Sequence, residues 1–476
     1  MTLRNTPEPL VSERRQIDTQ TIQALDSAHY MHPFTDTQAL AKRGARVITR
    51  GEGIYVWDSE GKKILDAMSG LWCVNIGYGR QELAQAAYLQ MMELPYYNSF
   101  FNTTNVPAVK LATKLCELAP TVGDRSFTHV FFSSSGSESN DTNIRMVRHY
   151  WASLGHPERK VIIGRKNGYH GSTIGGASLG GMQGMHDQGD LPIPGIVHID
   201  QPYFLENALQ GESEHDFGLR MARQLETKIL ELGADKVAAF IGEPIQGAGG
   251  VIIPPTSYWP EIQRIVDAYG ILLISDEVIC AFGRLGAWFA YEKMGYKPDL
   301  ITFAKGVTSG YIPLGGVMVG NRVSKVLIEQ GGDFNHGYTY SGHPVACQVA
   351  LATLDWMERA QIVERVRDDT GPYLAEKFAA LKDHPLVGDA RSLGLTAGLM
   401  LMKNKFTGAT FPPDVGVGMA CRAHCFNNGL VMRAVGDRMI IAPPLVMTRA
   451  DIDDMMRLIV RCLDLTLTEA RQKGWC

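Results

Sequence analysis

The sequence has no marked excess of charge, no long apolar run and no framework of cysteines, and each absence excludes a class of protein. Lys and Arg together number 46 and Asp and Glu 50, so the net charge of −4 gives no reason to expect a nucleic acid or an anionic membrane as a partner. The apolar runs are too short to cross a bilayer. The eight cysteines have no regular spacing, and the chain begins without a basic segment followed by an apolar one. We therefore expect a reduced, cytoplasmic protein.

The densest group of metal-ligating side chains is the segment CRAHC, which holds Cys421, His424 and Cys425. These residues fall on a helical pattern, and no second pair of ligands follows at a spacing typical of zinc sites. Packing of the thiols inside a helical layer is the simpler interpretation. We therefore predict no metal site.

The 476 residues exceed what one hydrophobic core usually supports, so more than one domain is expected. From about residue 80, helical periodicity alternates with short apolar runs, which is the pattern of βαβ units. The fold class is therefore α/β, with a mainly parallel seven-stranded sheet. The expected strands are Thr128–Phe132, Lys160–Gly164, Gly195–Ile199, Val237–Glu243, Ile271–Asp276, Asp299–Ala304 and Gly315–Gly320.

The sequence predicts one large and one smaller domain. Residues 80–344 form the large domain, which contains the expected sheet. Residues 1–79 comprise a polar surface arm and then the segment ARVITRGEGIYVWDSEGKKILDAMSG, whose alternation around glycine turns is typical of an antiparallel meander. We assign them to a smaller α+β domain, together with residues 345–476, where a long helical pattern precedes two candidate strand pairs.

Two of the expected strands end abruptly on a charged residue: ILLIS is followed by Asp276, and LITFA by Lys305. Buried parallel strands expose charge only where they leave the core, and open α/β sheets bind ligands at that carboxyl edge. The two residues form either a salt bridge or a pyridoxal phosphate site. In the second case, Lys305 forms a Schiff base with the cofactor aldehyde and Asp276 keeps the pyridine nitrogen protonated.

The segment SSSGSESN follows the first expected strand directly and precedes a helical pattern. Its small residues Ser135, Gly136 and Ser137 leave backbone N–H groups and hydroxyls free at a helix N-terminus, where they can hold a phosphate. A helix cap made by Ser135 or Ser137 with Glu138 or Asp141 is the structural alternative, and both can hold together. The segment has neither a Walker lysine nor the glycine spacing of a dinucleotide site.

Polar and aromatic residues at the ends of other strands and in a later loop complete the candidate cofactor site. Tyr169 and His170 follow one strand and Glu243 ends another, while Tyr338 and Thr339 lie in the loop NHGYTYSGHP. An aromatic ring on a loop suits a flat cofactor, although Tyr169 equally suits a partly buried core position. Loop hydroxyls can donate to a phosphate or cap a helix.

The segments SSSGSES, GYHGST, EPIQGAGG, ISDEVICAFGR, FAKG and HGYTYSGHP occur in this order, and over roughly residues 32–465 the chain resembles the class III, or omega, aminotransferases. The resemblance implies the pyridoxal-phosphate fold type I, with Lys305 bonded to the cofactor and Asp276 paired with its ring nitrogen. Val278 would pack on one face of the ring and Tyr169 on the other.

The same resemblance implies that the active site is shared between subunits. Gly136 and Ser137 would hold the cofactor phosphate, and Thr339 would reach it from the partner subunit of a homodimer. The sequence leaves open whether dimers pair into tetramers.

Two departures from the family pattern indicate the substrates. Relatives acting on ornithine or 4-aminobutyrate have a glutamate where this chain has Ala248, and a glutamine where it has Ile279. In those relatives the glutamate pairs with a mobile arginine, which corresponds here to Arg433. Without that acid, Arg433 suits the carboxylate of an acceptor such as pyruvate. The aromatic lining expected from Trp72, Phe100, Phe101 and Tyr169 favours an apolar or long-chain amine.

The predicted activity is thus ping-pong transfer of an amino group from a primary amine, such as putrescine, another polyamine, or an aryl or alkyl amine, to pyruvate. Alternatives on the same fold are an aminomutase, a decarboxylase, and an aminotransferase for β-alanine or 4-aminobutyrate. A non-catalytic ligand-binding protein is a further alternative, which the intact Lys305 and Asp276 disfavour.

Overall fold

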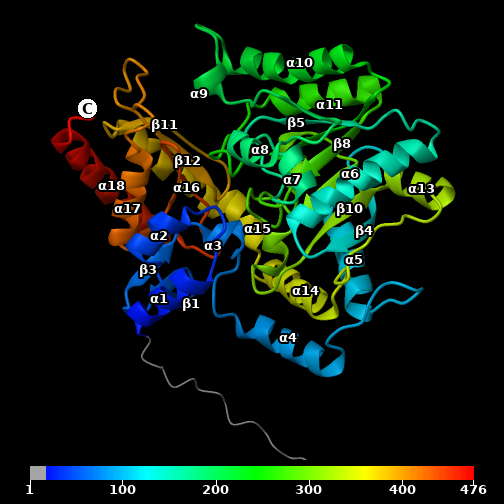
Figure 1. Ribbon diagram of the computed structural model, residues 1–476, viewed down its shortest axis with the longest axis horizontal. Coiled ribbons are helices and arrows are strands. Elements are labelled where there is room, and N and C mark those ends of the chain that lie inside the picture. Colours follow the sequence, from blue (N-terminus) through cyan, green and yellow to red (C-terminus); the bar gives the residue numbers. More distant parts are fainter. Residues whose placement is uncertain (1–17) are drawn as a thin grey trace, which may run out of the picture.

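The computed structural model describes residues 18–476, so residues 1–17 of the expected surface arm lie outside the described part. Figure 1 shows two groups of elements. The larger one surrounds a twisted central sheet, and the smaller one brings the first described helices next to the last ones of the chain.

The central sheet has seven strands in the order β4-β10-β9-β8-β7-β5-β6, and all are parallel except β10, which runs antiparallel to β4 and β9. Every strand expected from the sequence is present. Their bounds are β4 Phe127–Ser133, β5 Val161–Arg165, β6 Ile196–Ile199, β7 Val237–Gly242, β8 Leu272–Asp276, β9 Leu300–Phe303 and β10 Gly315–Gly320. The predicted α/β class with a mainly parallel sheet is confirmed.

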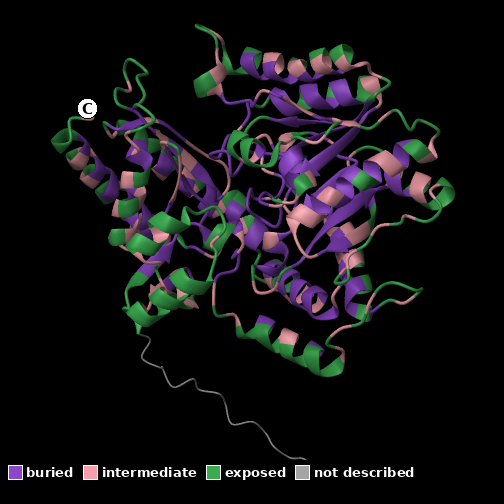
Figure 2. Ribbon diagram, viewed as in Figure 1, coloured by how far each residue is buried: buried purple, intermediate pink, exposed green. Residues whose placement is uncertain are grey.

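Helices cover both faces of this sheet, which explains why its strands are continuous apolar runs. In β8, Leu272 and Ile274 pack into one apolar cluster and Leu273 into the other. The first cluster includes α6 (Gly136–Ser153) and α13 (Asn321–Gln330). The second includes α5 (Val106–Leu118), α10 (Glu214–Leu232), α11 (Tyr258–Tyr269) and α14 (Pro344–Arg359). In Figure 2 the strands are buried between these layers.

Two smaller sheets form the second group. One has the order β1-β2-β3-β13, in which the parallel pair β3–β13 joins the expected N-terminal meander to the C-terminal segment, and the other has the order β11-β12-β15-β14. The bounds are β1 Ile48–Glu52, β2 Tyr55–Asp58, β3 Lys63–Asp66, β11 Val387–Ser392, β12 Ala397–Leu401, β13 Leu430–Val431, β14 Arg433–Val435 and β15 Arg438–Ile441. The domain boundaries at residues 79 and 344 stay predictions.

The remaining helices connect and cover these sheets, and within residues 18–476 none is long and apolar enough to cross a membrane. They are α1 Thr19–His29, α2 Thr37–Arg43, α3 Ser69–Trp72, α4 Gln81–Glu93, α7 Ile174–Leu179, α8 Gln183–Gly189, α9 Phe204–Asn207, α12 Ala290–Met294, α15 Ile362–Arg365, α16 Gly371–Ala379, α17 Val417–Asn427 and α18 Arg449–Gln472, with short helices η1 Lys305–Thr308, η2 Val366–Thr370 and η3 Ala380–Asp383.

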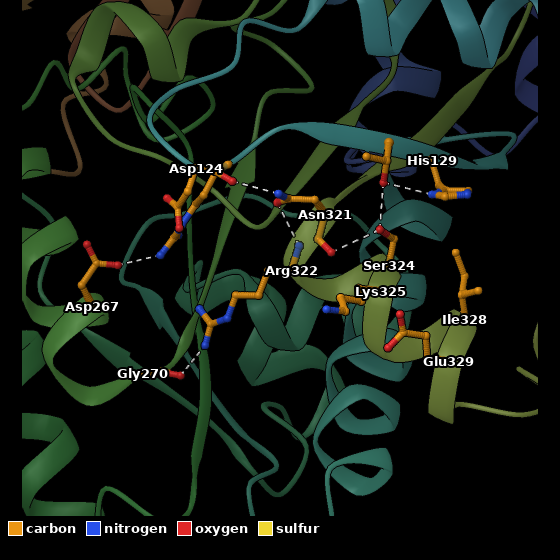
Figure 3. A pocket seen from close by; sticks show the side chains of 12 residues that line it. Asp124, His129, Asp267, Gly270, Asn321, Arg322, Ser324, Lys325, Ile328 and Glu329 are labelled. Carbon is orange, nitrogen blue, oxygen red and sulfur yellow. Dashed lines mark hydrogen bonds and ion pairs between the residues drawn. The ribbon is translucent and has the colours of Figure 1, made fainter.

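A charged clamp closes the edge of the central sheet at which β8 and β9 begin. The buried carboxylate of Asp299, just before β9, lies 3.4 Å from both Arg125 and Arg322 and accepts the backbone N–H of Leu273. Arg125 also pairs with the half-exposed Asp267 at 2.6 Å. A surface cavity of about 690 Å³ opens beside these groups. Figure 3 shows Arg322 bonded to the carbonyl of Gly270, and these bonds within the protein give this edge a structural role.

The clamp leads to a prediction about stability. Asp299→Ala leaves two arginines around an empty buried position, so we expect the free energy of unfolding to fall by about 3 kcal/mol or more. Asp267→Ala is the control, because it removes the half-exposed second partner of Arg125. It should lower the free energy of unfolding by less than about 1 kcal/mol. Denaturation midpoints measured at one protein concentration test this. Equal shifts would show that Asp299 contributes no more than a surface ion pair.

Candidate functional site

The opposite edge of the sheet opens into a cavity of about 800 Å³, and Lys305 lies in its wall immediately after β9. The backbone of Lys305 has φ +47°, a left-handed conformation that is uncommon for a residue with a side chain and is often found at functional sites. Burial lowers the pKa of Lys305, which the nearby Cys73, Asp276 and Glu243 partly oppose. A lowered pKa makes the neutral, nucleophilic amine more available.

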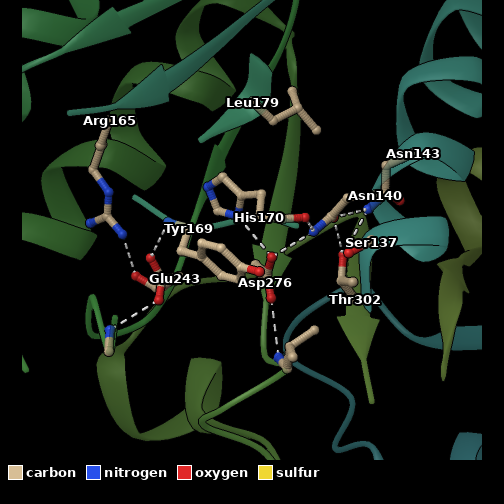
Figure 4. A network of polar contacts seen from close by, with 12 residues as sticks. Ser137, Asn140, Asn143, Arg165, Tyr169, His170, Leu179, Glu243, Asp276 and Thr302 are labelled. Carbon is tan, nitrogen blue, oxygen red and sulfur yellow. Dashed lines mark hydrogen bonds and ion pairs between the residues drawn. The ribbon is translucent and has the colours of Figure 1, made fainter. Parts of the chain in front are cut away.

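Asp276, at the end of β8, also faces this cavity and is held by three donors. Asn140 Nδ2 and His170 Nδ1 each lie 2.7 Å from its Oδ2, and the backbone N–H of Val278 donates to Oδ1. Figure 4 shows these contacts around the carboxylate. Asp276 and Lys305 form no ion pair, so the salt-bridge alternative is not realised within the described residues. The carboxylate is fixed in direction and remains available to a ligand.

A second layer of hydrogen bonds orients Asn140. Its Oδ1 accepts from Thr302 Oγ1 and from Asn143 Nδ2, and Asn143 also donates to Thr302. Because all three side chains are buried, they fix the amide that contacts Asp276. Asn140 was not predicted from the sequence. The available signal was its position four residues after Gly136, which places both on the same side of α6.

The start of α6 forms another wall of the cavity with Ser135, Gly136 and Ser137. Ser135 caps the helix, since its Oγ accepts the N–H of Glu138, while Glu138 accepts the N–H of Ser134. The predicted helix cap is therefore present. Ser137 Oγ accepts the N–H of Ser172 and so ties the helix to the next loop.

Val278 and Tyr169 both line the cavity, and their places on opposite faces of a cofactor ring stay a prediction. A Cβ on Gly136 would lie 2.9 Å from Val278, so only glycine leaves this close approach unstrained. Tyr169 is positioned by Glu243, whose Oε1 accepts its N–H and whose Oε2 accepts that of Gly247. Burial raises the pKa of Glu243, and the charge of His170 and the two backbone N–H groups partly oppose that rise.

The far side of the cavity is formed by aromatic and cationic side chains. Trp72 is buried, and the guanidinium of Arg433 on β14 lies 5.3 Å from its ring. Phe34 approaches the ring of Tyr169 at 6.4 Å. Phe34 was not predicted, because it stands in a polar segment without a periodic pattern. Arg422, which lines the cavity from α17, was not predicted either.

Four of the predicted residues lie elsewhere in the single chain: among residues 18–476, the cavity lining does not include Phe100, Phe101, Tyr338 or Thr339. Phe101 is 88% exposed. Tyr338 donates to the carbonyl of Glu138, and the exposed Thr339 accepts at its carbonyl from a neighbouring tyrosine. Their assignment to the site stays a prediction.

The groups that do line the cavity suit pyridoxal phosphate. They comprise a buried amine, an oriented carboxylate, two side chains that can pack on a ring and a helix N-terminus with small residues. Residues 18–476 contain no cluster of side chains that could hold a metal ion.

Comparisons with known proteins match nearly the whole chain. A family model described as aminotransferase class-III matches residues 39–463. The chain is 58% identical over 449 residues to the putrescine–pyruvate aminotransferase of Pseudomonas aeruginosa, covering 94% of this chain and 97% of that protein. It is 42% identical over 434 residues to gamma aminobutyrate transaminase 1 of Solanum lycopersicum, covering 90% and 84%. The omega transaminase of Pseudomonas jessenii, solved in complex with PMP, has a TM-score of 0.91 and 39% identity, covering 94% and 98%.

The loop beside α6 yields a prediction about cofactor binding. Gly171 has φ +132°, and a Cβ there would lie 2.7 Å from Cα and Oγ of Ser137. Gly171→Ala therefore strains the turn and displaces Ser137, so we expect pyridoxal phosphate to bind about tenfold more weakly. Gly184→Ala on α8 is the control, because a Cβ there meets nothing within 4 Å. Titration of the cofactor-free proteins measures this, and unchanged affinity in Gly171→Ala would contradict it.

Proposed function

This chain belongs to the class-III aminotransferases, whose cofactor is pyridoxal phosphate, and we propose that it transfers an amino group from a primary amine to pyruvate. The observation that carries the choice of acceptor is the environment of Arg433. This arginine lines the cavity together with Ala248 and Ile279, and no carboxylate pairs with it among the described residues. An unpaired guanidinium suits the carboxylate of a 2-oxo acid.

Different residues of the cavity would hold different parts of the cofactor. Lys305 would bond to the cofactor aldehyde and Asp276 to its ring nitrogen, with Val278 and Tyr169 on the two ring faces. Ser135, Gly136 and Ser137 would hold the phosphate, while His170 and Glu243 act through the groups that they position. When bound, pyridoxal phosphate withdraws electrons from the carbon that carries the amino group.

The side chains of the cavity would transfer the proton, orient the cofactor ring and bind the substrate carboxylate. Lys305 Nζ would remove the proton from the substrate carbon and return it, and its lowered pKa suits that exchange. Asp276, fixed by Asn140 and His170, would contact the ring nitrogen of the cofactor. Arg433 binds the carboxylate of pyruvate in one half-reaction and leaves room for the amine in the other.

The amine donor is proposed to be apolar or long-chained, with putrescine and related polyamines as first candidates. The 58% identity to the putrescine–pyruvate aminotransferase supports this choice. So does the aromatic wall of Trp72 and Phe34. The 42% identity to the gamma aminobutyrate transaminase keeps 4-aminobutyrate as the second candidate donor.

A panel of amines with pyruvate as acceptor tests this function. We expect alanine to form from putrescine, other diamines and an arylalkyl amine faster than from 4-aminobutyrate or β-alanine. Lys305→Ala should lose the visible absorbance of the lysine-bound cofactor and slow turnover by about a thousandfold or more. Lys325→Ala, at the opposite edge of the sheet, is the control. If 4-aminobutyrate proves the best donor, the second candidate replaces the first.

We also propose that the protein is a cytoplasmic homodimer with shared active sites. All eight cysteines are free, which suits a reducing compartment. The helix α4 is exposed along most of its length (Figure 2). It carries Met92, 70% exposed, and leads to the exposed Phe101. Tyr96 joins this region to the loop of Thr339 by a hydrogen bond. Exposed apolar side chains gathered on one helix and the segment after it are typical of an interaction site.

Shared sites can be tested by mixing two inactive proteins. If Thr339 completes the partner's phosphate site, hybrids of Lys305→Ala and Thr339→Glu contain one intact site, and a random mixture recovers about a quarter of the activity. Hybrids of Lys305→Ala and Ser137→Glu are the control, because Ser137 serves its own chain and no site is restored. Absence of recovery in the first mixture, with subunit exchange demonstrated, would argue for a site built within one chain.

A further inference from the structure

Arg438 is a buried arginine that connects the smaller group of elements to the larger one. It begins β15 and is 8% exposed. Its Nη1 donates to the carbonyl of Gly249 at 2.8 Å, and its Nη2 donates to the carboxylate of Glu206 on α9. The centre of the Tyr203 ring lies 3.8 Å from its guanidinium carbon. All three partners belong to the larger group, so one side chain joins the two groups at three points.

The carbonyl that accepts from Arg438 lies in a tight turn, residues 247–251, in which Ala248 lines the active-site cavity. Gly250 in the same turn has φ +122°, and a Cβ there would lie 2.7 Å from Cδ of Arg438 and 2.8 Å from its Nη1. The close approach of the guanidinium therefore requires a glycine at this position. The contact is made to the backbone directly beside the cavity wall.

The carboxylate that accepts from Arg438 is itself held in place by the larger group. Oε2 of Glu206 accepts from Gln201 Nε2 at 2.9 Å, and Oε1 of Gln201 accepts from Asn167 Nδ2 at 2.9 Å. Asn167 stands two residues before Tyr169, which lines the cavity. A chain of four polar side chains thus leads from β15 to the loop of Tyr169.

Within its own sheet, Arg438 lies beside the strand that carries the proposed substrate arginine. Strands β14 and β15 are antiparallel, with Arg438 opposite Val435. Arg433, two residues before Val435, lines the cavity from this sheet, whereas Ala248 lines it from the larger group. The contacts of Arg438 therefore join the two walls between which a substrate is expected.

We propose that Arg438 is a positioning residue, which sets the width of the substrate cavity by fixing Arg433 against the turn that carries Ala248. The inference rests on the proposed function, which places the substrate beside Arg433. A planar guanidinium with donors in fixed directions suits this role, because it fixes an angle as well as a distance between its partners. Lys305 and Asp276 lie at the ends of central strands, so Arg438 acts on substrate binding and not on the reacting groups.

Steady-state kinetics with putrescine and pyruvate separate this role from a general loss of stability. Arg438→Gln should raise KM for pyruvate about tenfold and change kcat less than about threefold, because a displaced Arg433 weakens binding while Lys305 stays in place. Partial unfolding would instead lower kcat at unchanged KM. Gly250→Ala, which crowds Arg438 from the side of the turn, is a second variant and should raise KM in the same way.

Arg391→Gln is the matched control. Arg391 on β11 connects the same sheet to the larger group through an ion pair of 2.9 Å with Glu214, and it also pairs with Asp389. Within residues 18–476 it forms no hydrogen bond to the turn 247–251. Its replacement should therefore leave both KM values unchanged, even where it lowers the unfolding temperature.

Hydrogen exchange followed by mass spectrometry tests the contact without a substrate. The amides of Gly250 and Val251 donate to the carbonyl of Gly247. In the holoenzyme, Arg438→Gln should speed exchange in this turn about tenfold or more and leave exchange in β8 and β9 unchanged. Arg391→Gln should leave the turn as it is.

The outcomes distinguish this proposal from the proposed function. Unchanged exchange in the turn, an unchanged KM for pyruvate in Arg438→Gln, or an equal rise of KM in Arg391→Gln would each overturn the role of Arg438. If the unmodified protein forms no alanine from pyruvate, the proposed function fails. Exchange in the turn and KM for the 2-oxo acid that the protein does use then decide on Arg438.

Discussion

The buried carboxylate of Asp276 is the constraint on which the rest of the site depends. A carboxylate removed from water is tolerated only when its oxygens accept hydrogen bonds. Its donors come from α6, from the loop after β5 and from the backbone beyond β8, through Asn140, His170 and Val278. Two distant segments, α6 and the loop after β5, must therefore meet at the end of β8. They do so because parallel strands bring their carboxyl ends to a common edge.

The two edges of the central sheet differ in whether their arginines are paired with carboxylates. At one edge, Asp299 pairs with Arg125 and Arg322, and these ion pairs connect the elements that meet there. At the other, neither Arg433 nor Arg422 pairs with a carboxylate among residues 18–476, although Asp276 and Glu243 line the same cavity. Ionic groups left unpaired contribute little to folding, and they are retained where a ligand completes them. The difference identifies the functional edge without reference to any relative.

The parts of this structure that the sequence predicts are those determined by local patterns. Apolar runs ending on Asp276 and Lys305 located two central strands, because burial on both faces leaves charge only at strand ends. Asn140, Phe34 and Arg422 were not found. Asn140 and Arg422 lie on helices whose inward direction depends on the layers packed around them, and Phe34 reaches the cavity from a segment without periodicity. The helix cap at residue 135 was predictable because it involves only neighbouring residues.

The reversed direction of β10 has a consequence for how rigidly the site is built. Because β9 and β10 are antiparallel neighbours, the connection between them, residues 304–314, leaves the sheet and returns to it at the same edge. Lys305 is thus held from both sides by the same sheet that carries Asp276, and the spacing of the two is set within one rigid layer. Trp72 and Arg433 belong to the smaller sheets and their flanking turns. A shift between the two groups of elements would therefore change the shape of the substrate cavity. The distance between the Lys305 amine and the Asp276 carboxylate would stay the same.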